Sequence, residues 1–263
     1  GRRWQINQVL KSMNKTPPKR IDAHFVAAGK YHDIDHARLE LLKLLAEHPH
    51  VRTTVACNYG DIDRIKQCRF LISYTCDLMP TREEAAAIRS WLEAGGKWLA
   101  LHGTNSILVF TESGLVDAPN DRPDVMDMLG TQFKAHPPIG PFRVEVVNRD
   151  HELTRGIDDF DVVDELYLSH TTSPIDTLMQ THFEGDATGF IDAKWGATTV
   201  PILYTRDIGN GRIVYNALGH CRGHYDLPGM ADFYPHPERC AWNYDVYYDL
   251  LRRGIDWAMR EGD

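Results

Sequence analysis

Lys97-Trp98-Leu99-Ala100-Leu101-His102-Gly103-Thr104 is the stretch that best indicates how this chain folds. It is an apolar, β-prone run that stops abruptly at a histidine beside a glycine. The segment before it begins at Pro80-Thr81-Arg82-Glu83-Glu84, which is typical of a helix start with Thr81 as N-cap, and Gly95-Gly96 ends that helix. A helix that leads directly into a buried strand is typical of a parallel sheet in an α/β protein.

The flanking segments continue this alternation of strands and helices. Upstream, strands are expected at 21–28, 51–57 and 69–74, with helices over 35–48 and 62–67. Downstream, 142–147 alternates like a half-exposed strand, 201–207 and 211–218 form a hairpin around Ile208-Gly209-Asn210, and a helix covers 244–260. We therefore predict an α/β fold with a mainly parallel central sheet and a β-hairpin extension. It forms one domain over residues 21–263, after a polar N-terminal arm over residues 1–20.

The composition argues against several classes of partner. The 263 residues carry a formal net charge of -8 and no lysine- or arginine-rich tract, which disfavours nucleic acid or an anionic membrane surface. No apolar stretch approaches the roughly 18 residues of a membrane span, and no signal-peptide pattern opens the chain. The five cysteines have no CxxC spacing, so reduced thiols in a cytoplasmic protein are expected. Because the chain begins at Gly1, a removed targeting segment stays an open question.

Histidines mark the ends of three predicted strands. His32 follows the strand at 21–28, His102 ends the stretch quoted above, and His220 follows the second strand of the hairpin. In open α/β sheets ligands bind at the carboxyl ends of strands. Gly103 permits a sharp turn like a nucleophile elbow, with a capped helix expected after it. An imidazole there favours acid–base or metal-ligand roles, and a core histidine bonded to backbone is the alternative.

An acidic pair stands in an apolar setting. Asp164-Glu165 lies between Val162-Val163 and Leu166-Tyr167, where an acid is partly buried and needs a partner. A solvated acidic face explains the neighbouring run 158–161 but explains this pair less well. A carboxylate that holds a histidine, binds a metal or takes a proton fits the setting.

These patterns predict a set of site residues. The candidate catalytic residues are His102, Glu165 and His220, and the candidate substrate-binding residues are Tyr31, His32, Asp33, Asn105 and Tyr167. The candidate ligands of a divalent metal, zinc or manganese, are His32, His220 and His224. His36 is expected on a helix surface, and His136 and His151 are expected to order loops. No nucleotide cofactor is expected.

Five motifs stand in order along residues 21–260. They are Gly29-Lys30-Tyr31-His32-Asp33, the stretch from Gly95 to Gly103, the stretch from His151 to Ile157, Asp164-Glu165-Leu166-Tyr167, and the stretch from Gly209 to His220. In these motifs the chain resembles the ThuA-like (trehalose-utilisation) family of the class I glutamine amidotransferase-like superfamily. The resemblance implies a flavodoxin-like three-layer sandwich and a role in the catabolism of disaccharides or oxidised (3-keto) glycosides. It also implies a pocket lined by His32, His102, Glu165 and His220.

Two departures bear on what this resemblance implies. His102 stands where glutamine amidotransferases place a cysteine, and Cys76 and Cys221 stand in the wrong context to replace it. Ammonia release by a thiolate is therefore not expected. The N-terminal arm and the histidine-, proline- and aromatic-rich insertion at 224–239 lie outside the family pattern and put its usual substrate in question.

The leading functional hypothesis is a sugar-catabolic enzyme that acts on a keto-sugar or related polyhydroxy carbonyl compound, as an isomerase, lyase or hydrolase. His102 or Glu165 would remove a proton next to the carbonyl while His220, with or without a metal, polarises the oxygen. The alternatives are a metal-dependent hydrolase of a non-sugar substrate and a non-catalytic sugar-binding protein. The expected partner is a small molecule, and Phe233-Tyr234 could either cover the site or join copies in a homo-oligomer.

Overall fold

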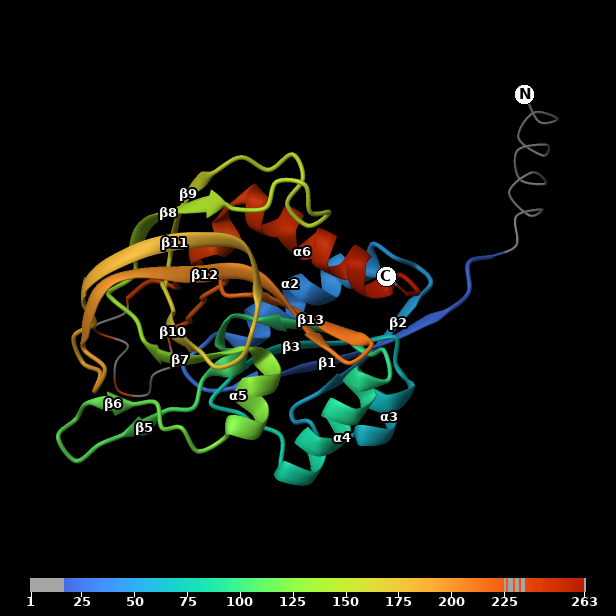
Figure 1. Cartoon of the computed structure of the whole chain (residues 1–263), viewed down its shortest axis with the longest axis horizontal. Coiled ribbons are helices and arrows are strands. Elements are labelled where there is room, and N and C mark those ends of the chain that lie inside the picture. The colour runs from blue at the N-terminus through green and yellow to red at the C-terminus, as the bar shows by residue number, and fades with distance from the viewer. Residues whose placement is uncertain (1–16, 225, 227–228, 230–231, 233–234, 263) are drawn as a thin grey trace.

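A nine-stranded sheet forms the centre of the computed structural model of this chain (Figure 1), in the order β2-β1-β3-β4-β13-β12-β11-β8-β9. The parallel part comprises β1 (Ile21–Gly29), β2 (Val51–Ala56), β3 (Phe70–Cys76), β4 (Lys97–Leu101) and β13 (Gly211–Asn216). The antiparallel part comprises β12 (Lys194–Ile208), β11 (Asp176–Asp186), β8 (Gly140–Val146) and β9 (Phe160–Asp164). The predicted α/β class is confirmed, and the large sheet is mixed, with a parallel part followed by an antiparallel part. Helices separate β1 to β4 along the chain, whereas no helix intervenes from β8 to β13, so those strands pair antiparallel.

Helices cover both faces of the parallel part. They are α2 (Ile34–Ala46), α3 (Ile62–Gln67), α4 (Arg82–Glu93), α5 (Pro123–Leu129) and α6 (Asp245–Met259). Successive strand residues enter different cores: Phe25 packs in the cluster that contains α2 and α6, and Val26 packs in the one that contains α3, α4 and α5. Thr81 is the N-cap of α4 as predicted, and it forms a capping box with Glu84.

The structure describes residues 17–262 except 225, 227–228, 230–231 and 233–234. Most of the predicted N-terminal arm and the pair Phe233-Tyr234 therefore lie outside the described residues. Two short sheets complete the described part: β5 (Val109–Phe110) pairs with β6 (Val116–Asp117), and β7 (Thr131–Ala135) pairs with β10 (Leu168–Thr171). None of the described helices is long and apolar enough to cross a membrane. All five cysteines are free thiols.

The strand β13 lies directly beside β4. Asn216 pairs with Leu101 in parallel register, so both strands end at the same edge of the sheet. This pairing places the segments that follow, beginning at His102 and Ala217, next to each other. The capped helix expected after His102 is instead a single 3-10 turn, η1 (His102–Asn105), which has no side-chain cap.

Gly29 ends β1 and lets the chain turn toward His32. Its φ of +128° lies in a region that side chains rarely adopt. A Cβ atom there would overlap the carbonyl oxygen of Cys76 and lie 2.7 Å from the Cys76 nitrogen. Because these atoms belong to β3 in the middle of the sheet, they cannot move aside cheaply.

Replacing Gly29 with alanine should therefore lower the free energy of unfolding by about 2–3 kcal/mol, since it adds overlap in a packed region. Gly114→Ala is the matched control, because Gly114 also has a positive φ but has open space around it. It should cost only about 1 kcal/mol. Urea denaturation of both variants checks this expectation, and equal losses would contradict the packing argument.

Candidate metal centre and active site

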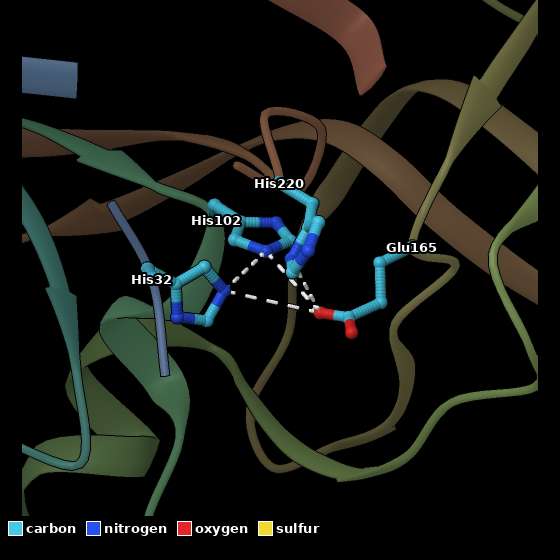
Figure 2. A group of neighbouring side chains, drawn as sticks. All are labelled: His32, His102, Glu165 and His220. Atoms are coloured by element: carbon cyan, nitrogen blue, oxygen red, sulfur yellow. Dashed lines mark hydrogen bonds and ion pairs between the residues drawn. The ribbon is translucent and has the colours of Figure 1, made fainter. Parts of the chain in front are cut away.

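Four buried side chains converge at the carboxyl-end edge of the parallel strands. His32 follows β1, His102 follows β4 and His220 follows β13, while Glu165 comes directly after β9. Figure 2 shows the four side chains pointing toward one another. One nitrogen or oxygen atom from each lies within 4.8 Å of the others. The structure thus brings together the three predicted catalytic residues and His32.

The turn at His102 is held tightly in place. Its φ is +44°, an unusual conformation for a residue with a side chain, as at a nucleophile elbow. The Tyr215 hydroxyl donates to the His102 carbonyl, and His102 Nδ1 lies 2.8 Å from the Ala217 carbonyl oxygen. Gly103 packs against β3, where an added Cβ would lie 2.6 Å from the Thr75 oxygen. The backbone therefore fixes where this imidazole points.

Backbone hydrogen bonds determine which ring nitrogen carries the hydrogen in His102 and His32. A carbonyl oxygen only accepts, so Nδ1 of His102 donates to Ala217, and Nδ1 of His32 donates to Lys30 at 3.0 Å. The remaining Nε2 atoms of His32 and His102 face each other at 3.0 Å. In neutral rings both atoms carry lone pairs, which repel at that distance unless a proton or a metal cation lies with them.

At His220, the Glu238 carboxylate takes the place that a backbone carbonyl has at His32 and His102. Its Nε2 lies 2.7 Å from Glu238 Oε2, and its Nδ1 lies 3.0 Å from Glu165 Oε2. A carboxylate behind the imidazole fixes the ring orientation and raises its basicity. The three inward nitrogens and Glu165 Oε2 form a set of donors that could hold a metal ion.

The charges of the cluster follow from burial and from its neighbours. Burial raises the pKa of Glu165, but the imidazoles of His136 and His220 outweigh it and hold that pKa well below its usual range. Burial, reinforced by His102 and His220, lowers the pKa of His32 well below its usual value. At His220 the effect of burial is outweighed by Glu165 and Glu238, and the pKa rises to about 9. An ionised Glu165 and a neutral His32 are the forms that bind metals, and binding at His220 would release a proton.

Two further predicted substrate-binding residues lie at the cluster. The Tyr167 hydroxyl lies 3.4 Å from His32 Nε2, and its ring centroid lies 4.2 Å from that of His102. Tyr31 lines the cavity beside the cluster together with His32 and Glu165. Both positions fit a role in contacting a ligand, which stays a prediction.

Three other predicted site residues lie elsewhere. Asp33 caps α2 by accepting from the His36 amide at 3.0 Å, because it directly precedes the helix. Asn105 is buried behind the elbow, with its amide 2.8 Å from the Thr131 hydroxyl. His224 is absent from the four-residue cluster found among the described residues, where His102 and Glu165 complete the set. On a helix the four-residue spacing of His220 and His224 would bring the two rings to one face, but this segment is not helical.

Three residues of the site were not predicted. His136 Nδ1 contacts the Pro137 carbonyl in its own loop, but Nε2 lies 3.1 Å from Glu165 Oε1. Its position directly after β7 is the signal that could have identified it, since it too follows a strand. Arg222 Nη2 lies 3.7 Å from Glu165 Oε1, and Glu238 supports both Arg222 and His220. Glu238 belongs to the insertion at 224–239, and no sequence pattern there indicates that it contacts His220 or Arg222.

Asp164 connects Glu165 to the segment that carries His220. Its buried carboxylate accepts from the backbone amides of Glu165 at 2.9 Å, Gly219 at 2.7 Å and His220 at 3.1 Å. Because β9 is the edge strand of the antiparallel part, these bonds connect the far end of the sheet to the segment after β13. Asp164 therefore positions Glu165 relative to His220.

Comparisons with known proteins agree with the motifs. The sequence model of the ThuA family, described as trehalose utilisation, matches residues 25–234. A ThuA-like protein from Bacteroides uniformis has a similar structure, with a TM-score of 0.67 and 17% identity over 95% of this chain and 96% of that one. A ThuA-like protein from Parabacteroides merdae has a TM-score of 0.61 and 16% identity, covering 92% and 90%. At these identities the likeness concerns the fold alone. No curated protein sequence matches the chain significantly.

Asp164→Asn should lower the free energy of unfolding by about 1–3 kcal/mol, because the new amide group faces backbone N–H groups that need an acceptor. Asp161→Asn on the same strand is the control, since its exposed side chain pairs with Arg143 at the surface. It should change stability by less than about 0.5 kcal/mol. Chemical denaturation separates the two, and a neutral Asp164→Asn substitution would show that Asp164 does not hold the site together.

Proposed function

Since this chain belongs to the ThuA family, described as trehalose utilisation, we propose that it is an enzyme of sugar catabolism whose buried cluster binds a divalent metal ion and the substrate. The observation that supports this most directly is the orientation of the three imidazoles. Each has its outer nitrogen bonded to a carbonyl or carboxylate, so its other nitrogen faces Glu165 and the neighbouring rings. This arrangement is what metal-binding histidines use to fix ring orientation and tautomer.

The donor set fits a divalent transition metal. His32, His102 and His220 offer nitrogen, and Glu165 offers a carboxylate oxygen. Imidazole with carboxylate suits zinc and also manganese, and we propose one of these two. When bound, such an ion supplies Lewis acidity that polarises a carbonyl oxygen.

The residues of the chain supply the proton transfer. Glu165 directs Oε2 toward the imidazoles and Oε1 toward His136, which also lines the adjoining cavity. His136 Nδ1 donates its hydrogen to the Pro137 carbonyl. A neutral imidazole has only one N–H group, so Nε2 can donate to Glu165 only when the ring carries a second proton. The Glu165–His136 pair is therefore able to share a proton at the pocket wall. We propose that Glu165 removes a proton next to the carbonyl of a keto-sugar and that His136 helps to return it.

We propose acid–base chemistry at a carbonyl rather than catalysis by a cysteine, because the cluster contains no thiol and burial raises the pKa of Cys76, which lines the adjoining cavity. His102 occupies the elbow, and burial raises the pKa of the Cys221 thiol to about 12. Isomerisation and elimination of a keto-glycoside both begin with the loss of such a proton; elimination expels the aglycone, and addition of water to the resulting double bond completes a hydrolysis. The product of the reaction distinguishes them.

Metal binding is tested on the purified chain. After loading with zinc or manganese and desalting, we expect about one ion per chain by elemental analysis, as for a single metal site. His102→Ala should weaken this binding by more than about 100-fold because it removes a ligand. His182→Ala is the control, since His182 lies at the surface beside Glu145. Failure of the folded wild-type chain to retain either ion would contradict the proposed metal centre.

The chemistry is tested by proton NMR with a panel of 3-keto-glycosides in deuterated water, with and without a chelator. We expect deuterium uptake next to the carbonyl or a new product. Glu165→Gln should slow it by about 10²–10⁴-fold, because the amide cannot take the proton. Glu145→Gln on the surface is the matched control. Measuring the metal content of each variant separates loss of the base from loss of the ion.

Silence across this panel, with folded and metal-loaded wild-type chain, would contradict the keto-sugar substrate. Binding of a sugar without conversion would instead favour a sugar-binding protein. Conversion of a non-sugar amide or ester would favour a metal-dependent hydrolase.

A further inference from the structure

A cavity of about 140 Å³ adjoins the cluster, and its walls are mostly apolar. Its polar lining residues gather around Glu165: His136 lies 3.1 Å from that carboxylate, Arg222 lies 3.7 Å from it and His32 lies 3.8 Å from it. The remaining walls are largely aromatic or aliphatic, formed by Leu108, Phe110, Val116, Phe133 and Phe190 with two tyrosines. The cavity thus has a polar end at the cluster and an apolar remainder.

The aromatic walls run from the buried cluster to the surface. Phe133 is buried, and its ring centroid lies 4.4 Å from Tyr167 and 5.8 Å from Phe190. Phe110 is 59% exposed and makes an edge contact with Tyr31, 6.0 Å between centroids. Large exposed aromatic side chains at the mouth of a cavity are typical of ligand contacts. Phe110 therefore lies at the rim, and Phe133 lies deep in the cavity.

These walls are poorly suited to the hydroxyl groups of a sugar ring. A buried hydroxyl without a hydrogen-bond partner is strongly disfavoured. Among the described wall residues outside the polar end, the oxygen donors are the two tyrosines, and Tyr167 already lies 3.4 Å from His32. A flat apolar group needs no such partners, and apolar cavities bind benzene.

We propose that the substrate carries an aryl group, or a flat apolar group of similar size, which binds between the aromatic walls. Its carbonyl-bearing sugar part then lies at the Glu165 end. This inference rests on the proposed function, since it takes the cluster as the reacting centre. It deepens that function by naming the substrate class: a glycoside with an aromatic aglycone rather than a purely polar disaccharide.

The test compares two glycosides that lack the keto group and so cannot react. Phenyl β-D-glucopyranoside and methyl β-D-glucopyranoside are titrated into the intact chain by calorimetry, and saturation-transfer NMR identifies the protons in contact. The phenyl compound should bind at least about tenfold more tightly, because it buries an apolar ring that the methyl compound lacks. Its phenyl protons should also receive more saturation than its sugar protons. Equal affinities, or no phenyl glucoside binding at millimolar concentration, would overturn the proposal.

Two neighbouring residues on β5 provide matched variants. Phe110 lines the cavity, whereas Val109 precedes it, is also exposed and is not among the lining residues. Phe110→Ala should weaken phenyl glucoside binding by about fivefold and leave methyl glucoside binding unchanged, since only the ring contact is lost. Val109→Ala should change neither. Equal weakening of both compounds by Phe110→Ala would mean that Phe110 stacks on the sugar, which overturns the assignment of the walls to an aglycone.

A second variant blocks the cavity instead of opening it. Val116→Trp places a large side chain at a lining position that is only half-buried, so the fold should tolerate it, as a thermal melt can verify. Phenyl glucoside binding should fall by at least about tenfold. Unchanged binding would overturn the proposal. Because no turnover is measured, failure of the keto-sugar reaction leaves this result standing, and the reverse also holds.

Discussion

The parallel pairing of β13 with β4 is the interaction on which the site depends. Leu101 and Asn216 are register partners, so the chain leaves both strands at the same edge and delivers His102 and the segment leading to His220 to one place. The pairing also supplies the carbonyl of Ala217, which orients the His102 ring. β1 belongs to the same parallel part and adds His32 at the same edge. A shift in the register of β13 would move Ala217 and His220 away from His102 and His32.

The second constraint is electrostatic and acts at the centre of the cluster. Backbone carbonyls behind His32 and His102 and a carboxylate behind His220 hold three ring nitrogens toward Glu165. The two Nε2 lone pairs of His32 and His102, 3.0 Å apart, are unfavourable in a buried site unless a cation accompanies them. Asp164 maintains the arrangement through three backbone amides, using the edge strand of the antiparallel part. The fold therefore stabilises a geometry that the four side chains alone would not adopt.

Much of this could be predicted because strand ends and glycines are local signals. The alternation of strands and helices up to Leu101 and the turn at His102-Gly103 are visible in the sequence, as are the histidines that follow three strands. Contacts between distant segments cannot be seen in the sequence. Glu238 reaches His220 only because the insertion at 224–239 folds back onto the segment after β13. The antiparallel part of the sheet is larger than the expected hairpin, because the strands from β8 to β13 have no intervening helices and pair antiparallel.

The strand order also bears on how the chain is made. β4 is complete at residue 101, but its neighbour β13 begins only at residue 211, so much of the chain is synthesised in between. Until then one side of β4 has unpaired backbone groups and fully buried residues such as Trp98 lack their native covering. Exposed apolar strand edges invite association with other chains. The arrangement that assembles the site thus leaves one edge of β4 open until the last strand has been synthesised.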